Sequence, residues 1–133
     1  MVKVLVKKLN SKVKLPIYKT QGSSGMDLMA FLDKSISIMP QKSELIPTAL
    51  SIAIPDNTEV QIRPRSGLAA KNNITVLNTP GTIDSDYRGE LKVILYNHGD
   101  KEFRVNNGDR IAQMVIVPII KATFEEVEDL PDT

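Results

Sequence analysis

The chain has 133 residues, of which 17 are basic and 16 acidic, and its net charge of +1 at pH 7 provides no basic surface of the kind that binds nucleic acid. Cysteine is absent and His98 is the only histidine, which argues against disulfides, thiolate metal sites and histidine-held zinc. The N-terminus is too charged for a signal peptide and no segment is long and apolar enough to span a membrane. We therefore expect a single cytoplasmic domain over residues 1–133.

Short apolar runs follow one another along the chain, separated by Gly, Pro, Asn and Asp. They predict strands at residues 2–6, 36–38, 50–54, 60–62, 74–77, 91–96, 103–105, 111–117 and 122–127. One short helix is expected over residues 66–71, with Ser66 as its N-cap. The pattern indicates an all-β fold, a jelly-roll-like β-sandwich or barrel with one short helix, and the acidic tail after Glu125 is expected to leave the sheet.

Four segments of the chain carry residues that are suited to binding or catalysis, and the first two of them precede residue 72. In residues 23–30, Asp27 is expected on the opposite face of a strand from Met26 and Leu28. A lone acid at a strand edge is commonly structural. In residues 63–71, a strand runs into a turn that opens the helix, where Arg65 and free backbone amides predict an anion site. A capped helix with surface arginines remains the alternative.

The third and fourth segments lie further along the chain. In residues 78–90, alternation along an extended strand would place four charged residues on one side and Ile83 and Tyr87 on the other. The mixture of turn residues with carboxylates predicts a hairpin that presents backbone donors and acceptors and one catalytic base. A solvated charged face is the alternative. In residues 108–115, Arg110 and Gln113 are unusual in so apolar a strand, and a buried salt bridge would explain Arg110.

The four segments SSGMDLMA, PRSGLAAK, NTPGTIDSDYRGEL and GDRIAQMV, in this order, resemble the motifs of the trimeric dUTPase family and cover residues 23–115. The resemblance implies a homotrimer of β-clip, jelly-roll-like subunits with active sites between subunits. It also implies Mg²⁺-assisted hydrolysis of dUTP to dUMP and pyrophosphate, which lowers dUTP and supplies dUMP for thymidylate synthesis.

Roles of individual residues are likewise implied by the resemblance. Asp84 matches the catalytic base that deprotonates the attacking water, and Tyr87 matches the aromatic residue beneath the deoxyribose. Asp27 matches an acid that reaches the metal through water, since the phosphates hold Mg²⁺ in this family. The remaining matches concern the substrate. The uracil-reading hairpin corresponds to Asn78, Gly81, Thr82, Ile83 and the backbone of Asp84. The phosphate contacts correspond to Arg65, Ser66, Gly67 and Gln113, and a main-chain contact to the base corresponds to Lys92.

The family's fifth motif, a Gly-rich arm near the C-terminus, is not found in residues 1–133. Because residues 124–133 resemble the acidic segment that precedes this arm, we expect that the arm was removed or is mobile rather than missing from the protein. Two rival interpretations are a dCTP deaminase, which shares the fold, and a non-catalytic relative. The uninterrupted segment IDSDYRGEL favours uracil recognition over the first, and an intact Asp84 argues against the second.

Overall fold

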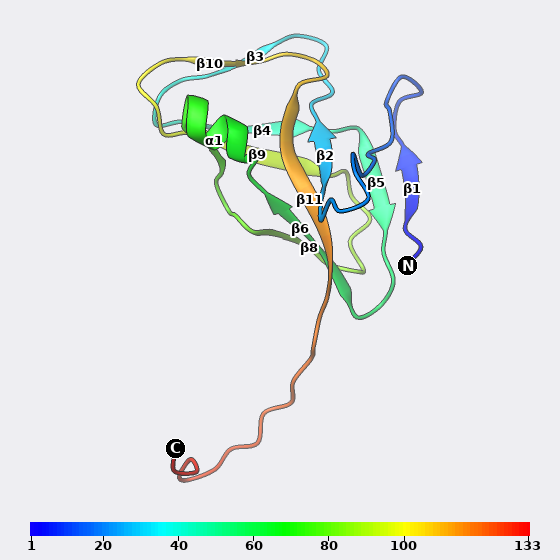
Figure 1. Ribbon diagram of the computed structural model, residues 1–133, viewed down its shortest axis with the longest axis vertical. Coiled ribbons are helices and arrows are strands. Elements are labelled where there is room, and N and C mark those ends of the chain that lie inside the picture. Colours follow the sequence, from blue (N-terminus) through cyan, green and yellow to red (C-terminus); the bar gives the residue numbers. More distant parts are fainter.

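The computed structural model describes residues 1–133 and confirms the all-β prediction with a single short helix (Figure 1). The elements in chain order are β1 Leu5–Lys8, β2 Met26–Met29, β3 Ile36–Ile38, β4 Ser43–Pro47, β5 Leu50–Ala53, β6 Thr58–Arg63, α1 Ser66–Asn72, β7 Ile74–Val76, β8 Gly81–Ile83, β9 Lys92–Asn97, β10 Phe103–Val105 and β11 Arg110–Pro118. The helix α1 is 7 residues long, and no helix is long and apolar enough to cross a membrane.

The strands form small antiparallel sheets that are stacked as a jelly-roll-like sandwich. One sheet has four strands in the order β2-β11-β6-β8, a second has three in the order β4-β9-β7, and the pairs β1-β5 and β10-β3 extend the layers. Alternation along the strands sends one face inward, as in β6, where Val60 and Ile62 are buried and Gln61 is not. The inward residues join one aliphatic core.

One polar side chain lies within this core, and both its nitrogen and its oxygen have hydrogen-bond partners. Asn97 at the end of β9 is fully buried, and its Nδ2 donates to the carbonyls of Ile38 at 2.9 Å and Lys101 at 2.7 Å. Its Oδ1 accepts from the Gly99 amide at 2.8 Å. Because all these partners are backbone groups, the asparagine ties the loop after β9 to the end of β3.

The predicted strand at residues 122–127 is wrong. The chain leaves the sheet after Pro118, and residues 119–133 extend away from the sandwich with Ile120, Phe124 and Leu130 exposed (Figure 1). The alternation of apolar residues is present, but within one chain no free strand lies beside this segment to receive its hydrogen bonds. The departure of the acidic tail is confirmed and begins before Glu125.

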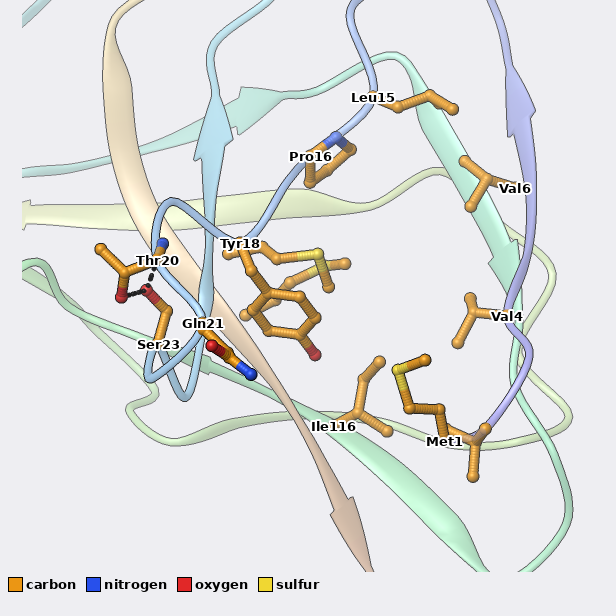
Figure 2. Close-up of a pocket in the computed structure, with 13 residues that line it drawn as sticks. Met1, Val4, Val6, Leu15, Pro16, Tyr18, Thr20, Gln21, Ser23 and Ile116 are labelled. Carbon is orange, nitrogen blue, oxygen red and sulfur yellow. Dashed lines mark hydrogen bonds between the residues drawn. The ribbon is translucent and has the colours of Figure 1, made fainter.

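A groove of about 650 Å³ separates β1 from β2 and β11, and its walls are mostly apolar (Figure 2). Val4 and Val6 line one side, and Leu15, Pro16 and Ile116 line the remainder. At its polar end, the Oγ1 of Thr20 lies 2.9 Å from the Oγ of Ser23, which closes a short turn. The groove is the largest cavity of the chain, yet it contains none of the residues predicted to act on a substrate.

Candidate active site

The turn between β6 and α1 differs from its prediction in one respect. Arg65, with an extended backbone (φ −87°, ψ 127°), occupies the N-cap position, and Ser66 is the first helical residue. No side chain caps the helix, and its first turn contains no acid. The amides at the start of α1 and the hydroxyl of Ser66 therefore remain free of local partners, as an anion site requires.

Three cationic side chains converge on Asp27 in β2. The Nε of Arg65 lies 3.2 Å from Oδ1, while the Nζ of Lys19 and the Nη1 of Arg110 lie 3.6 and 3.7 Å from Oδ2. Asp27 is indeed paired, as a structural acid would be, but the salt bridge of Arg110 is largely exposed rather than buried, with 47% of its side chain accessible. Three positive charges against one negative charge leave the cluster net positive and suited to phosphate.

A β-bulge in β11 places two of the predicted residues on the same face. Arg110 and Gln113 are three residues apart, and strict alternation would send them to opposite sides of the sheet. The pairing of β11 with β2 shifts register between Arg110 and Ala112, so that Gln113 pairs with Asp27 and Arg110 still reaches the same carboxylate. The extra residue therefore aims a second polar side chain at the site, a common use of bulges.

Gln113 also connects the strand to the turn before α1. Its Nε2 donates to the carbonyl of Pro64 at 3.1 Å. A side chain on Gly25 would begin 2.7 Å from the Oε1 of Gln113, so only glycine permits this approach. The result is a polar pocket of about 170 Å³, which is lined by Asp27, Arg65, Ser66, Gly67 and Gln113.

All five residues of this phosphate-sized pocket were expected from the sequence, and they come from three segments that are distant along the chain. Lys19 was missed because it lies outside all four motifs and only the fold brings it to Asp27. The pocket offers one carboxylate, already paired with cations, and the chain has no group of three or more acids, histidines or cysteines that could hold a metal ion. Its donors fit an anion, and a divalent metal would fit only together with phosphate oxygens.

The third segment does not form the predicted hairpin, because the strands on either side of its turn do not pair with each other: β8 pairs with β6, and β9 pairs with β4 and β7. The Thr79–Pro80 peptide is cis, and β8 then pairs with β6, Gly81 opposite Ile62 and Ile83 opposite Val60. Asn78 is exposed and packs against Gly81, where an added side chain would begin 3.1 Å from its Nδ2.

After Ile83 the chain turns instead of continuing as a strand. The Tyr87 amide donates to the Asp84 carbonyl at 3.1 Å, and Arg88 folds back to donate to the carbonyls of Ser85 and Tyr87. The expectation that the charged residues share one face is therefore wrong, because the Ser85-Asp86 pair favours a turn over an extended backbone. Asp84 and Tyr87 are exposed, so both can meet a ligand.

The turn after β8 and the phosphate-sized pocket lie towards opposite ends of β6. Ile83 pairs with Val60 near the start of this strand, whereas Arg65 follows its end. At about 3.3 Å per residue, the intervening backbone separates Asp84 from the pocket by roughly 15–20 Å. Figure 1 shows the same relationship, with α1 at one end of β6 and the turn after β8 towards the other. Within one chain, Asp84 cannot reach an anion bound beside Arg65. Lys92 is exposed at the start of β9, the strand that follows this turn in the chain.

The sequence profile of the dUTPase family matches residues 11–133 of the chain. The chain is 49% identical over 132 residues to a protein of Syntrophotalea carbinolica named deoxyuridine 5'-triphosphate nucleotidohydrolase, covering 99% of the chain and 90% of that protein. It is 56% identical over 128 residues to a protein of the same name from Clostridium tetani, covering 96% and 87%.

Solved structures of phage dUTPases have the same fold. The dUTPase of Staphylococcus bacteriophage 80alpha, solved with dUpNHpp, superposes with a TM-score of 0.87 at 24% identity, over 98% of the chain and 90% of that protein. A dUTPase variant from phage phi11 of S. aureus, whose structure describes a structural Mg(II) ion, gives the same TM-score at 22% identity and covers 98% and 99%. At this level of identity the likeness concerns the fold.

Proposed function

The chain belongs to the dUTPase family, and from this premise we propose that it hydrolyses dUTP to dUMP and pyrophosphate by attack of water on the α-phosphorus. The observation that carries the proposal is identity of 49–56% over almost the whole chain with proteins named for this activity. The match includes all four segments that carry the candidate site residues.

The phosphate-sized pocket is assigned to the triphosphate. Arg65 supplies a positive charge, Ser66 and Gly67 supply a hydroxyl and backbone amides, and Gln113 supplies a side-chain amide. The pair between Asp27 and Arg65 gives the guanidinium one orientation before the substrate arrives, which reduces the entropy lost on binding.

Mg²⁺ is proposed to enter with the substrate. Phosphate oxygens and water would provide most of its ligands, and Asp27 would contact it through water, which agrees with a pocket that contains a single carboxylate. When bound, the ion neutralises charge on the phosphates and aligns them for in-line displacement.

Residues 78–92 are assigned to the nucleoside and to the chemical step. Asp84 is exposed and free to accept a proton from the attacking water, a role that requires only hydrogen-bond reach in the complex. Asn78 and the backbone from Gly81 to Asp84 would read uracil, with Lys92 contributing through its main chain. Tyr87 would lie against the deoxyribose and exclude a 2′-hydroxyl.

A homotrimer with shared sites is proposed because one chain cannot complete the site. Asp84 and Arg65 lie at opposite ends of β6, so a neighbouring chain must bring one of them to the other. The apolar groove and the exposed apolar residues of the tail, such as Phe124, add surfaces that a second copy would cover. Closed rings of identical subunits provide such contacts for every chain at once.

The experiment is a comparison of nucleotides with the purified protein and Mg²⁺. Pyrophosphate release from dUTP, with much slower release from dTTP, dCTP and UTP, is the expected result. Ammonia release from dCTP would instead indicate a deaminase, and binding of dUTP without turnover would indicate a non-catalytic relative. Either result would contradict the proposed function.

A further inference from the structure

Glu90 is a half-buried acid at the end of the turn that follows β8, and it carries no role in the reaction described so far. Its Oε2 accepts a hydrogen bond of 3.0 Å from the backbone amide of Ala49, in the turn between β4 and β5. Ala49 is buried and has a φ of 56°, a left-handed conformation that residues with a side chain rarely adopt. Such a backbone persists only where surrounding contacts hold it in place.

The backbone next to Glu90 is fastened to the same turn. The Oγ1 of Thr48 donates to the carbonyl of Leu91 at 2.6 Å, and the Leu91 amide donates to the carbonyl of Leu50 at 2.7 Å. Residues 48–50 therefore form a fixed support, to which the end of the 84–90 turn is attached by backbone bonds and by one carboxylate.

Hydrogen bonds connect Glu90 to Tyr87, which is assigned to the sugar, and through Tyr87 to Asp84, which is assigned to the attacking water. The Oη of Tyr87 donates to the Glu90 carbonyl at 3.1 Å. The ring lies directly over Gly89, where a side chain would begin 2.6 Å from the ring carbon Cζ. The Tyr87 amide in turn donates to the Asp84 carbonyl. A displacement of Glu90 would thus move the aromatic ring and the proposed base together.

The carboxylate of Glu90 has no cationic partner, since every ion pair of the chain involves Asp27. Its single hydrogen bond is made to a backbone amide. We propose that Glu90 is a positioning residue, which holds the 84–90 turn on the Ala49 amide and so determines how well Tyr87 excludes a 2′-hydroxyl. The inference rests on the proposed function, because it concerns the same nucleotide site.

The test compares Glu90→Met, which keeps the length of the side chain but has no acceptor, with Glu90→Gln, which keeps an acceptor for the amide. Glu90→Asp serves if the methionine variant does not fold, because its shorter side chain does not reach Ala49. Glu44→Met, at an exposed position of β4, is the matched control. The readouts are kcat and KM for dUTP and UTP, together with hydrogen exchange of residues 84–90 in the nucleotide-free protein.

In Glu90→Met we expect faster hydrogen exchange in the turn. We also expect kcat/KM for dUTP to fall by roughly 10- to 100-fold, because small misplacements of catalytic groups have effects of this size. The ratio of kcat/KM for dUTP to that for UTP should decrease. Glu90→Gln and Glu44→Met should resemble the wild type. An unchanged ratio of dUTP to UTP in Glu90→Met, or a glutamine variant as impaired as the methionine variant, would overturn the inference. If the wild type fails to hydrolyse dUTP, the proposed function fails, while hydrogen exchange still decides whether Glu90 holds the turn.

Discussion

Arg65 and Asp27 form the closest ion pair of the protein, with Nε 3.2 Å from Oδ1, although they are 38 residues apart in the chain. The pair is only about one quarter exposed, and its Asp27 is also the counter-charge of Lys19 and Arg110. Its consequence is orientation, because a guanidinium held at Nε presents its remaining donors to the pocket in one direction.

Asp27→Ala should therefore impair the enzyme without unfolding it. We expect a rise in KM for dUTP of about tenfold from loss of orientation, and a Tm roughly a few degrees below that of the wild type, because Lys19, Arg65 and Arg110 lose the one carboxylate that they share. Steady-state kinetics and calorimetry measure the two effects, with Asp33→Ala, at an exposed position, as the control. A normal KM in Asp27→Ala would show that Arg65 does not need this partner.

Gly25→Ala tests the close approach of β2 to β11. The new methyl group would lie 2.7 Å from the Oε1 of Gln113 and 3.1 Å from the carbonyl oxygen of Met114, so the Gln113 side chain would have to leave its place and the backbone of β11 would have to shift slightly. We expect destabilisation of about 1–3 kcal/mol, typical of overpacking, and weaker binding of dUTP. Gly22→Ala is a matched control, because nothing lies within 4 Å of its added carbon. Equal unfolding free energies for the two variants would contradict the packing argument.

Asp84→Asn should separate binding from turnover. Asparagine keeps the shape of the side chain but cannot accept the proton of the water, so kcat should fall by about 10²–10⁴-fold while KM changes little. Asp86→Asn, two residues along the same turn, is the control and should retain most of the activity. A kcat near the wild-type value in Asp84→Asn would exclude this carboxylate as the base.

Tyr87→Ala should reduce discrimination between sugars. Without the ring, a 2′-hydroxyl no longer clashes with the side chain at this position, so the ratio of kcat/KM for dUTP to that for UTP should decrease by about tenfold. Rejection of dTTP should persist, because the backbone of residues 81–84 is assigned to the base. Tyr87→Phe keeps the ring but loses the hydrogen bond from Oη to the Glu90 carbonyl, so its ratio should fall less than that of Tyr87→Ala. If Tyr87→Ala left the ratio between dUTP and UTP unchanged, another residue would have to exclude ribose.

Mixed oligomers test whether Asp84 and Arg65 act across a subunit interface. Inactive Asp84→Asn and Arg65→Ala chains, unfolded and reassembled together, should regain activity because some sites combine an intact Asp84 with an intact Arg65 from another chain. Random mixing of equal amounts should restore about one quarter of the sites. Each variant reassembled alone is the control and should stay inactive. Absence of recovery in well-folded mixed trimers would place both residues in one chain.

Local patterns predicted most of the strands and the helix because burial follows alternation directly, as in β6, but they missed β4. They failed where the outcome depends on a partner strand. The tail at residues 122–127 alternates like a strand but lies outside the sheet, because nothing within one chain pairs with it. Alternation also misled the interpretation of residues 84–90, where turn residues outweigh an extended backbone.

The candidate site was predicted from four motifs, and the five residues of the phosphate-sized pocket do meet. The motifs alone could not predict the contacts that their residues make with residues outside the motifs. Lys19 reaches Asp27 only through the fold, and Glu90 reaches Ala49 across 41 residues. Nor does the sequence show that β6 separates the turn after β8 from the pocket, since that follows from the register of β8 on β6.

The length of β6 has a consequence for the behaviour of the protein at low concentration. If one strand separates the base from the phosphate contacts, an isolated chain can fold and still contain no complete site. Specific activity should then depend on protein concentration, falling on dilution as subunits dissociate by mass action and recovering when the protein is concentrated again. Substrate that bridges two chains would oppose this dissociation, so dUTP itself would favour the assembly that hydrolyses it.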